Sequence, residues 1–255
     1  MAEELRSEVR GSVLTLTINR PERRNAMNPA VVQGLREAIV GANRDGAIRA
    51  IVITGVGEQA FCAGADLQSG KSFAFDYSDP YLGLADLLRV ARQSTIPLIA
   101  RVNGACMAGG MGLMAMCDMA VARGNAIFGL PEVKVGLFPA QVLSVLQSLV
   151  PRRLLNEMCL CGEPITAADA LAAGLVNYVD DDLDGRIDWL LGRLLDKSPT
   201  AIRRGLYTIK HVEDMPFAQS MAFTESQIGL LAMTEDAREG QLAFREKRRP
   251  GWTGK

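Results

Sequence analysis

Apolar and polar residues follow two different periods in the first part of the chain, and the two periods alternate. Residues 12–18 (SVLTLTI) alternate between apolar and polar side chains, which predicts a strand with one buried face. Residues 29–43 carry apolar side chains at helical spacing, and Asn28 is expected to cap this helix. Residues 50–54 form an apolar run, as expected for a strand covered on both faces. This order of strand, helix and strand favours an α/β fold.

The same alternation continues through the middle of the chain. A helix is expected over residues 81–93, and strands are expected over residues 96–102 and 119–123, with a glycine-rich segment between the two strands. Residues 68–80 show little periodicity and have the composition of a surface loop.

The last part of the chain predicts helices. Residues 166–169 (TAAD) have the pattern of a capping box, and Gly174 is expected to end the helix that follows it. No strand is expected after about residue 195. We therefore expect a core over residues 1–195 and a helical region over residues 196–255 that packs on the core or on another subunit. The other helices are expected over residues 140–150, 151–160, 183–196, 199–210, 216–232 and 234–245.

Composition narrows the class of protein. A net charge of -1 over 255 residues gives no electrostatic reason to expect nucleic acid or an anionic membrane as a partner. The first residues, MAEELRSEVRG, lack the apolar core of a secretory signal. The longest uncharged run, residues 102–117, is too short and too rich in glycine to span a bilayer. We expect a soluble, cytoplasmic protein.

The residues that usually carry metal or nucleophile chemistry are scarce. The cysteines (Cys62, Cys106, Cys117, Cys159 and Cys161) are odd in number, form no C-x-x-C pair and lie in apolar surroundings, so we expect reduced core residues. His211 is the single histidine, which leaves no material for a histidine-rich metal site or a Ser-His-Asp triad. Acid–base chemistry must therefore depend on carboxylates.

The segment at residues 101–118 (RVNGACMAGGMGLMAMCD) is the first candidate site. An extended run ends there, and Gly109, Gly110 and Gly112 precede a Leu, Met and Ala helix. A glycine-rich bend before a helix leaves backbone N–H groups free at the positive helix end, where they can hold an anion.

Two other interpretations of these glycines stay open. Gly110, Gly112 and Ala115 spell the dinucleotide fingerprint G-x-G-x-x-A, with Glu132 near the distance expected for its acidic residue, so an NAD-binding oxidoreductase is one alternative. Against it, Gly110 lies far beyond the predicted strand end at Val102. The second alternative is that the glycines have no role in a site and only allow a Met-rich buried helix to pack closely.

Glu132 is the candidate catalytic carboxylate. It stands among prolines and glycines with apolar neighbours on both sides, a setting that removes water and raises a carboxyl pKa toward that of a general base. The alternative is a surface turn in which Glu132 caps the chain or pairs with Lys134.

The order of several segments resembles the crotonase superfamily, the enoyl-CoA hydratase/isomerase fold. The segments are FCAGADL, IPLIARVNGACMAGGMGLMAMCDMAVA, FGLPEVKVGLFP, LCGEPITAADALAAGLVNYV and AREGQLAFREKRRP, which span nearly the whole chain. The resemblance implies an α/β fold with a core of repeated ββα turns over residues 1–195, which carries an acyl-CoA site. Residues 196–255 would form a helical region that makes homotrimers, often paired into hexamers.

The resemblance also assigns roles to residues. The thioester oxygen of an acyl-CoA would lie between the N–H groups of Ala65 and Gly109, and Glu132 matches the second catalytic glutamate of the family. Phe244 and Lys247 would reach the coenzyme A bound to the adjacent protomer. No metal or redox cofactor is implied, because coenzyme A enters as part of the substrate. The other residues implied in substrate and coenzyme A binding are Arg23, Arg24, Ala26, Ala63, Asp66 and Leu67.

Two departures from the family pattern bear on the reaction. Gly112 stands where hydratases of the family have their first catalytic glutamate, and residues 139–142 (PAQV) replace a glycine-rich segment. Both positions help to hold the water that hydratases add. The sequence therefore favours double-bond isomerisation by a single glutamate. Hydration with a second acid from Asp76 or Asp79 and a catalytically silent acyl-CoA-binding trimer remain alternatives.

Overall fold

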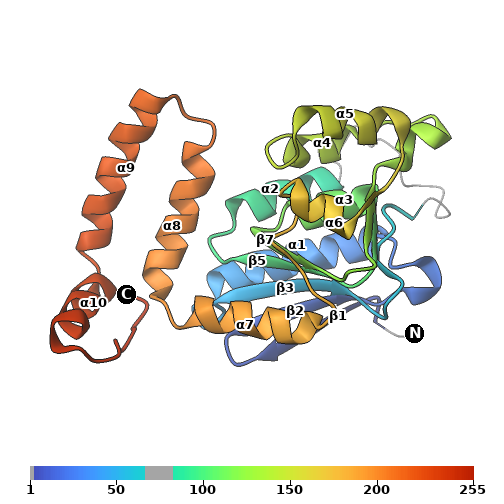
Figure 1. The fold of residues 1–255 in the computed structure, drawn as a ribbon. Helices are drawn as coiled ribbons and strands as arrows, with labels where there is room; N and C mark the ends of the chain where they lie inside the picture. Colours follow the sequence, from blue (N-terminus) through green and yellow to red (C-terminus); the bar gives the residue numbers. More distant parts are fainter. Residues whose placement is uncertain (1–2, 67–82) are drawn as a thin grey trace, which may run out of the picture.

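Two β-sheets form the centre of the protein in a computed structural model, which describes residues 3–66 and 83–255 (Figure 1). The six-stranded sheet has the order β1-β2-β3-β5-β7-β10, and the four-stranded sheet has the order β4-β6-β8-β9. In the larger sheet β1 is antiparallel to β2, and all other neighbours are parallel. The strands are β1 Leu5–Arg10, β2 Val13–Ile18, β3 Ala50–Gly55, β4 Ala60–Cys62, β5 Leu98–Val102, β6 Ala105–Met107, β7 Met119–Ala122, β8 Ile127–Gly129, β9 Ile165–Thr166 and β10 Tyr178–Val179.

The core repeats one structural unit. The chain passes from β3 in the large sheet to β4 in the small sheet and then into α2, and the same path recurs through β5, β6 and α3 and through β7, β8, η3 and α4. This repeat confirms the α/β fold and the ββα spiral that the resemblance implies. The helices of the core are η1 Pro21–Arg23, α1 Pro29–Arg44, α2 Gly83–Gln93, α3 Gly109–Ala115, η3 Pro131–Val135, α4 Ala140–Leu146, α5 Arg152–Cys161, α6 Ala167–Ala172 and α7 Leu183–Leu195.

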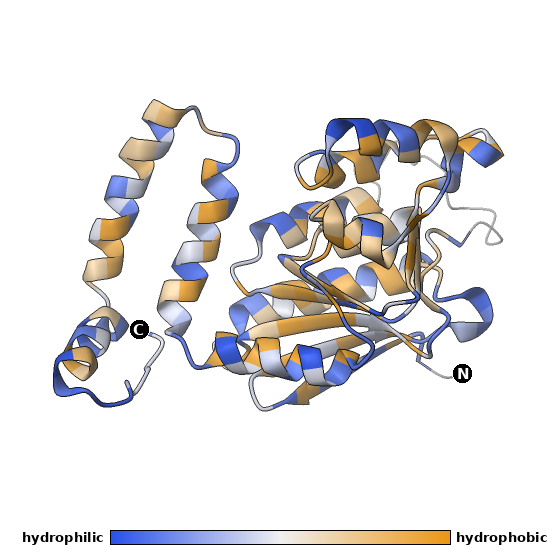
Figure 2. Cartoon of the chain, viewed as in Figure 1, coloured by the Kyte–Doolittle hydropathy of each residue, from blue (hydrophilic) through white to orange (hydrophobic). Residues whose placement is uncertain are grey.

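Strand β3 is buried on both faces, as its apolar run predicts. Ile51 and Ile53 belong to the main apolar cluster together with Leu35 of α1, whereas Val52 faces the other way and packs in a second cluster with Ile187 of α7. Each of these fully buried side chains contributes roughly 1.5–3 kcal/mol. Figure 2 shows the apolar strands enclosed between the helices.

Local helix signals in the sequence are confirmed. The Asn28 side chain accepts a hydrogen bond from the N–H of Val31, and Pro29 occupies the first helical position of α1. Thr166 and Asp169 form the expected capping box of α6, with each side chain bound to the backbone of the other residue.

Several strands were not predicted from the sequence. Strands β4, β6 and β8 have three residues each, too few for a period of two to appear. Strand β1 lies at the edge of the large sheet, and its side chains beyond Leu5 are exposed, so it carries no apolar signal.

The cysteines are all free, and most are core residues as expected. Cys62, Cys106 and Cys159 are buried, and Cys117 is half-buried. Cys161 is exposed and therefore corrects the expectation of a core position, because it is the last residue of α5.

The chain after residue 195 is helical, as predicted, and forms α8 Pro199–Val212, α9 Phe217–Ala232 and α10 Glu235–Glu246. Helices α8 and α9 form a hairpin that extends away from the two sheets (Figure 1). A division into two domains at residue 195 stays a prediction. Over residues 3–66 and 83–255, no helix combines the length and the hydrophobicity that crossing a membrane requires.

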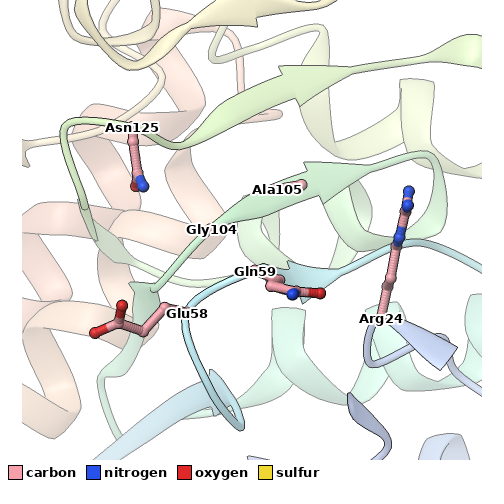
Figure 3. Close-up of a pocket in the computed structure, with 6 residues that line it drawn as sticks. All are labelled: Arg24, Glu58, Gln59, Gly104, Ala105 and Asn125. Carbon is pink, nitrogen blue, oxygen red and sulfur yellow. The ribbon is translucent and has the colours of Figure 1, made fainter. Parts of the chain in front are cut away.

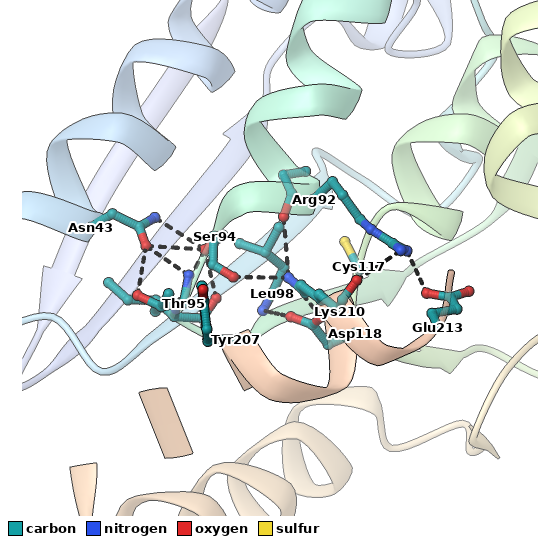
Figure 4. Close-up of polar contacts among 12 residues, drawn as sticks. Asn43, Arg92, Ser94, Thr95, Leu98, Cys117, Asp118, Tyr207, Lys210 and Glu213 are labelled. Atoms are coloured by element: carbon teal, nitrogen blue, oxygen red, sulfur yellow. Dashed lines mark hydrogen bonds and ion pairs between the residues drawn. The ribbon is translucent and has the colours of Figure 1, made fainter. Parts of the chain in front are cut away.

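A polar network attaches α8 to the core (Figure 4). The Lys210 Nζ lies 3.0 Å from the carboxylate of Asp118, and it donates to the carbonyl oxygens of Ala91 and Ser94 at the end of α2. Both side chains of this ion pair are nearly buried. Because a buried charge without its partner is costly, Lys210 holds the last turn of α8 against the core.

Candidate active site

Three connections meet at one edge of the small sheet. Strands β4, β6 and β8 are parallel, with Cys62 paired to Cys106 and Met107 paired to Gly129, so their carboxyl ends lie together. Ala65, Gly109 and Glu132 follow these three strands within a few residues. The carboxyl edge of parallel strands is where α/β proteins commonly bind ligands. The structure therefore brings these three predicted site residues to one edge.

The N–H group of Ala65 points away from the contacts that hold its loop. The loop pairs with Met27 through its neighbours: the N–H of Met27 donates to the carbonyl of Gly64 at 2.7 Å, and the N–H of Asp66 donates to the carbonyl of Met27 at 2.9 Å. In this parallel bridge Met27 uses both its N–H and its carbonyl, whereas Ala65, between Gly64 and Asp66, uses neither its own N–H nor its own carbonyl. Among the described residues, the N–H of Ala65 has no hydrogen-bond partner.

Gly109 begins α3 and presents another free N–H group. Ala108, the N-cap residue, has φ 52° and ψ -124°, a conformation that costs free energy in a residue with a side chain. Its N–H donates to the carbonyl of Gly129 at 2.8 Å, which ties the start of α3 to β8. Within the part of the chain that the structure describes, nothing accepts a hydrogen bond from the Gly109 N–H.

The two free N–H groups are neighbours. A Cβ atom on residue 109 would lie 3.7 Å from the nitrogen of Ala65, and a Cβ atom on residue 64 would lie 3.2 Å from the nitrogen of Gly109. Gly64 has φ +99°, and a Cβ there would also approach the Ala108 side chain to 2.8 Å, so only glycine fits. Two donors placed side by side can stabilise one oxygen atom that gains negative charge.

Glu132 lies on η3 next to this edge and is half-buried. Its Oε2 atom is buried and finds no hydrogen-bond partner among the described residues. Burial raises the pKa of the Glu132 carboxyl above its ordinary value, as its apolar setting predicts. The alternative pairing with Lys134 does not form, because the Lys134 Nζ lies 2.7 Å from Glu163 instead. A carboxylate of this kind is suited to taking a proton.

Comparison with known proteins decides the family. The family model described as Enoyl-CoA hydratase/isomerase matches residues 8–255. The chain belongs to the enoyl-CoA hydratase/isomerase family.

Two similar proteins illustrate the range of relatives. The chain is 36% identical to 2,3-dehydroadipyl-CoA hydratase of Escherichia coli (strain K12), a match that covers 95% of this chain and 96% of that protein. It is 31% identical to (E)-benzylidenesuccinyl-CoA hydratase of Thauera aromatica over 97% of this chain and 98% of that one.

Solved structures of the family have the same fold. The enoyl-CoA hydratase of Mycobacterium smegmatis matches with a TM-score of 0.90 and 32% identity, covering 98% of this chain and 99% of its own. The enoyl-CoA hydratase from Bacillus anthracis matches with a TM-score of 0.93 and 25% identity, covering 99% of this chain and 100% of its own.

The family resemblance also places Arg23, Arg24, Ala26 and Ala63 near the substrate. Both arginines lie on the exposed turn at η1, and the Arg24 carbonyl accepts a hydrogen bond from the N–H of Ala63 at 3.1 Å, which ties this turn to the loop of Ala65. Ala26 is buried. The Arg24 side chain lines an open cavity of about 460 Å³ (Figure 3). The other lining residues are Glu58, Gln59, Gly104, Ala105 and Asn125.

Asp66 holds the loop of Ala65 in place. Its carboxylate lies 2.6 Å from a guanidinium nitrogen of Arg20, and both side chains are almost fully buried. Arg20 also donates to the carbonyl of Ala26 at 2.6 Å. Sequence reasoning missed Arg20, because nothing near it in the chain signals a partner as distant as Asp66.

Phe244 and Lys247 do not lie at the candidate site of their own chain. Phe244 is 85% exposed on α10, and Lys247 ends this helix in a left-handed conformation, at the far side of the helical region from the sheets (Figure 1). Their assignment to the site of an adjacent protomer stays a prediction. Leu67, Asp76 and Asp79 lie outside the described residues.

The dinucleotide interpretation does not fit the structure. Gly110 lies inside α3 rather than at a strand end, and Glu132 lies on a 3-10 helix. A Cβ atom on residue 110 would lie 2.3 Å from the carbonyl oxygen of Cys62, so this glycine allows α3 to pack closely on β4. Close packing, one of the two open alternatives, accounts for Gly110.

Proposed function

We propose that the protein moves the double bond of an enoyl-CoA thioester from carbon 3 to carbon 2, with Glu132 as its acid–base group. The observation that carries this proposal is the buried, unpartnered Oε2 of Glu132 at the sheet edge that also presents the free N–H groups of Ala65 and Gly109. A carboxylate and two donors are the groups that a proton shift next to a thioester requires.

The steps follow from thioester chemistry. Glu132 takes a proton from carbon 2 of a 3-enoyl-CoA, and the negative charge passes to the thioester oxygen. The N–H groups of Ala65 and Gly109 stabilise this oxyanion, and each such donor lowers the barrier by roughly 3 kcal/mol. Glu132 then returns the proton to carbon 4, which gives the 2-enoyl-CoA. Substrate and product have the same atoms, so no water or further reactant enters.

The environment of Glu132 supports both halves of this cycle. Its raised pKa makes the ionised form a stronger base toward a weakly acidic C–H bond, and it makes the protonated form stable enough to persist until the return step. The Oε2 atom has no competing donor among the described residues, so it is available to the substrate.

Hydration of a 2-enoyl-CoA is the second candidate, and the names of several relatives favour it. Besides the two hydratases above, a crotonyl-CoA hydratase of Syntrophomonas wolfei is 30% identical over 99% of this chain. Addition of water needs a group that positions the water in addition to Glu132. Residue 112 is glycine and cannot supply that group, so a hydratase would need another acid, with Asp76 and Asp79 as the first residues to test.

Product masses distinguish these functions. Incubation with a 3-enoyl-CoA should give a 2-enoyl-CoA of unchanged mass, whereas hydration of a 2-enoyl-CoA adds the mass of water. We expect isomerisation to be at least tenfold faster than hydration, and the reverse ratio would support the hydratase. Chromatographic separation of the 3-enoyl and 2-enoyl isomers detects isomerisation, because their masses are equal. Binding of both thioesters with neither isomer conversion nor addition of water would indicate a catalytically silent acyl-CoA-binding protein.

We further propose that the protein assembles as a homotrimer, alone or in pairs as a hexamer, through its helical region. Exposed apolar side chains on α9 and α10 support this assembly, because an isolated monomer rarely leaves so many in water. They are Phe217, Met221, Ile228 and Leu230 on α9, Met233 directly after it, and Leu242 and Phe244 on α10. A cytoplasmic location also stays a prediction.

A further inference from the structure

Helices α3 and α4 meet at Gly112 and Val142, two residues that the steps above do not use. Gly112 is buried, and the Val142 side chain is 3% exposed. A Cβ atom on residue 112 would lie 3.2 Å from Val142 Cγ2 and 3.7 Å from both Cβ and Cγ1 of Val142. The first distance is shorter than the 3.5–4.0 Å of a good carbon–carbon contact. Val142 therefore fills the space in which a side chain on residue 112 would begin.

This contact lies about one helical turn after Gly109, whose N–H is free among the described residues. Gly109 and Gly112 are three residues apart in α3, so they share one face of the helix. Val142 comes from the chain that follows Glu132: the N–H of Leu137 donates to the Glu132 carbonyl at 3.0 Å, and Pro139 then precedes α4. The segment that carries the proposed base thus returns to α3 one turn beyond the proposed oxyanion donor.

Val142 has little freedom to move aside. A valine in a helix strongly prefers one χ1 rotamer, so its γ carbons cannot swing away without strain. The contact with the Val142 Cβ, at 3.7 Å, is an ordinary one, whereas the 3.2 Å approach to Cγ2 requires Val142 to shift by a few tenths of an ångström. Removal of the two γ carbons would therefore be enough to make room for a side chain on residue 112.

We propose that Gly112 and Val142 are a steric pair and that Val142 is a specificity-determining residue. Its side chain occupies the space beside residue 112 with hydrocarbon, and we infer that it thereby disfavours a second carboxylate there and the water that such a carboxylate would hold. This inference rests on the proposed isomerase function. It makes a definite claim about substitution: a glutamate at residue 112 can enter the site only after Val142 has been made smaller.

A stability cycle tests the steric pair without reference to activity. The variants are Gly112→Ala, Val142→Ala and both together, and the measured quantity is the thermal midpoint Tm. Alanine is a better helix former than glycine, so Gly112→Ala should raise the Tm when Val142 is already alanine. In the wild-type background the clash with Cγ2 should cancel or reverse that gain. Equal Tm shifts of Gly112→Ala in the two backgrounds would overturn the steric pair.

An activity cycle tests the role in specificity. Gly112→Glu alone should hydrate a 2-enoyl-CoA no faster than the wild type, whereas Gly112→Glu with Val142→Ala should hydrate it at least tenfold faster. Gly112→Gln with Val142→Ala is the matched control, because it has the same shape without a carboxylate, and it should show no gain. A single Gly112→Glu variant as fast as the double variant would refute the proposal.

The two cycles separate this inference from the proposed function. If the Tm values show coupling but no variant gains hydration, Val142 does not determine specificity. Isomerisation of a 3-enoyl-CoA by the wild type would still support the proposed function. If the wild type fails to isomerise any 3-enoyl-CoA, the proposed function fails, while the Tm cycle still decides whether the two residues form a steric pair.

Discussion

The chemistry of Glu132 depends on the isolation of one oxygen atom. Its Oε2 is buried without a partner among the described residues, because Lys134, the nearest cation in sequence, pairs with Glu163. Burial raises the pKa of the Cys159 thiol, and the Glu132 charge raises it further, so this neighbour supplies no positive charge to Glu132. These surroundings leave Glu132 without a compensating cation among the described residues, which suits the proposed role as a base.

Glu132→Gln should abolish turnover while changing the affinity for an acyl-CoA by no more than a few-fold. The amide keeps the shape and packing of the side chain but cannot accept a proton. Steady-state rates with a panel of enoyl-CoA thioesters, together with calorimetric titration of an unreactive acyl-CoA, check both parts. Near-normal turnover of the variant would show that another group is the base.

The raised pKa of Glu132 also predicts the pH dependence of the reaction. The reaction starts from the ionised carboxylate, so kcat/KM should fall as the pH decreases through the Glu132 pKa, and that midpoint should lie above the ordinary value of 4.5. The raised pKa means that the ionised form is less favourable in the folded protein, so the folding contribution of Glu132 is best at low pH and decreases as the pH rises through its pKa. The Tm gain of Glu132→Gln over the wild type should therefore be larger at pH 8 than at pH 4. A midpoint at or below 4.5 would contradict the assignment.

Sequence reasoning at the residue scale worked where the signal was local. Prolines, glycines and apolar residues around Glu132 predicted its partial burial, and Asn28 was found because its partner Val31 is three residues away. Arg20 was missed because its partner Asp66 is distant in sequence and only the folded chain brings them together. The roles of Ala65 and Gly109 were inferred from the family resemblance, since the pattern of side chains does not indicate which backbone N–H groups are free.

At the scale of elements, the position of α3 against β4 sets the distance between the two proposed oxyanion donors. The two elements touch at Gly110. A Cβ atom on residue 110 would lie 2.3 Å from the Cys62 carbonyl oxygen and 3.0 Å from the Cys62 Cβ. Both of these atoms belong to or adjoin the backbone of a buried strand and cannot move aside.

Gly110→Ala should therefore lower both activity and stability. We expect kcat to decrease by about 10²-fold, because displacement of α3 removes Gly109 from its place beside Ala65, and the Tm should decrease by several degrees. Gly41→Ala is a matched control: residue 41 lies within α1 with nothing inside 4 Å of an added Cβ, so the substitution should raise the Tm slightly. A Gly110→Ala enzyme with wild-type rates would show that the spacing of α3 and β4 does not control the reaction.

The elements themselves were predictable in proportion to their length. Helix α1 and strand β3 are long enough to show their periods, and both were predicted within one or two residues. The strands β4, β6 and β8 are not predicted by the sequence, because each is held by pairing with its neighbours rather than by its own pattern. These short strands lead into the candidate site residues, so the sequence pattern could indicate Glu132 and the glycine-rich segment but not the sheet that brings them together.

At the scale of the whole molecule, Lys210 provides a nearly buried ionic link between the helical region and the core. Lys210→Ala leaves the nearly buried Asp118 carboxylate without its cation and the carbonyl oxygens of Ala91 and Ser94 without their donor. Loss of one partner of a buried pair typically costs about 3–5 kcal/mol, and the residual exposure here places the expected cost near the low end of this range. Urea unfolding measures it, with Lys197→Ala on the exposed pair with Asp196 as the control that should change little.

The helical region should complete the site of a neighbouring protomer. Phe244 and Lys247 lie at the exposed end of α10, and Figure 1 shows α10 far from α3 of the same chain, so we expect them to contribute to coenzyme A binding from another copy. A mixture of two inactive proteins tests this arrangement. One carries Glu132→Gln with an intact helical region, and the other carries Phe244→Ala and Lys247→Ala with an intact Glu132.

In a mixed trimer, a site with wild-type Glu132 receives Phe244 and Lys247 from the Glu132→Gln protomer beside it. Joint refolding of the two proteins should therefore restore a substantial fraction of wild-type activity, well above the sum of the two refolded separately. The control is a chain that carries all three substitutions, which should rescue neither partner. Sedimentation of the mixture verifies the trimer itself. If the mixed trimers form but their activity equals the sum of the separate proteins, Phe244 and Lys247 do not act across the interface.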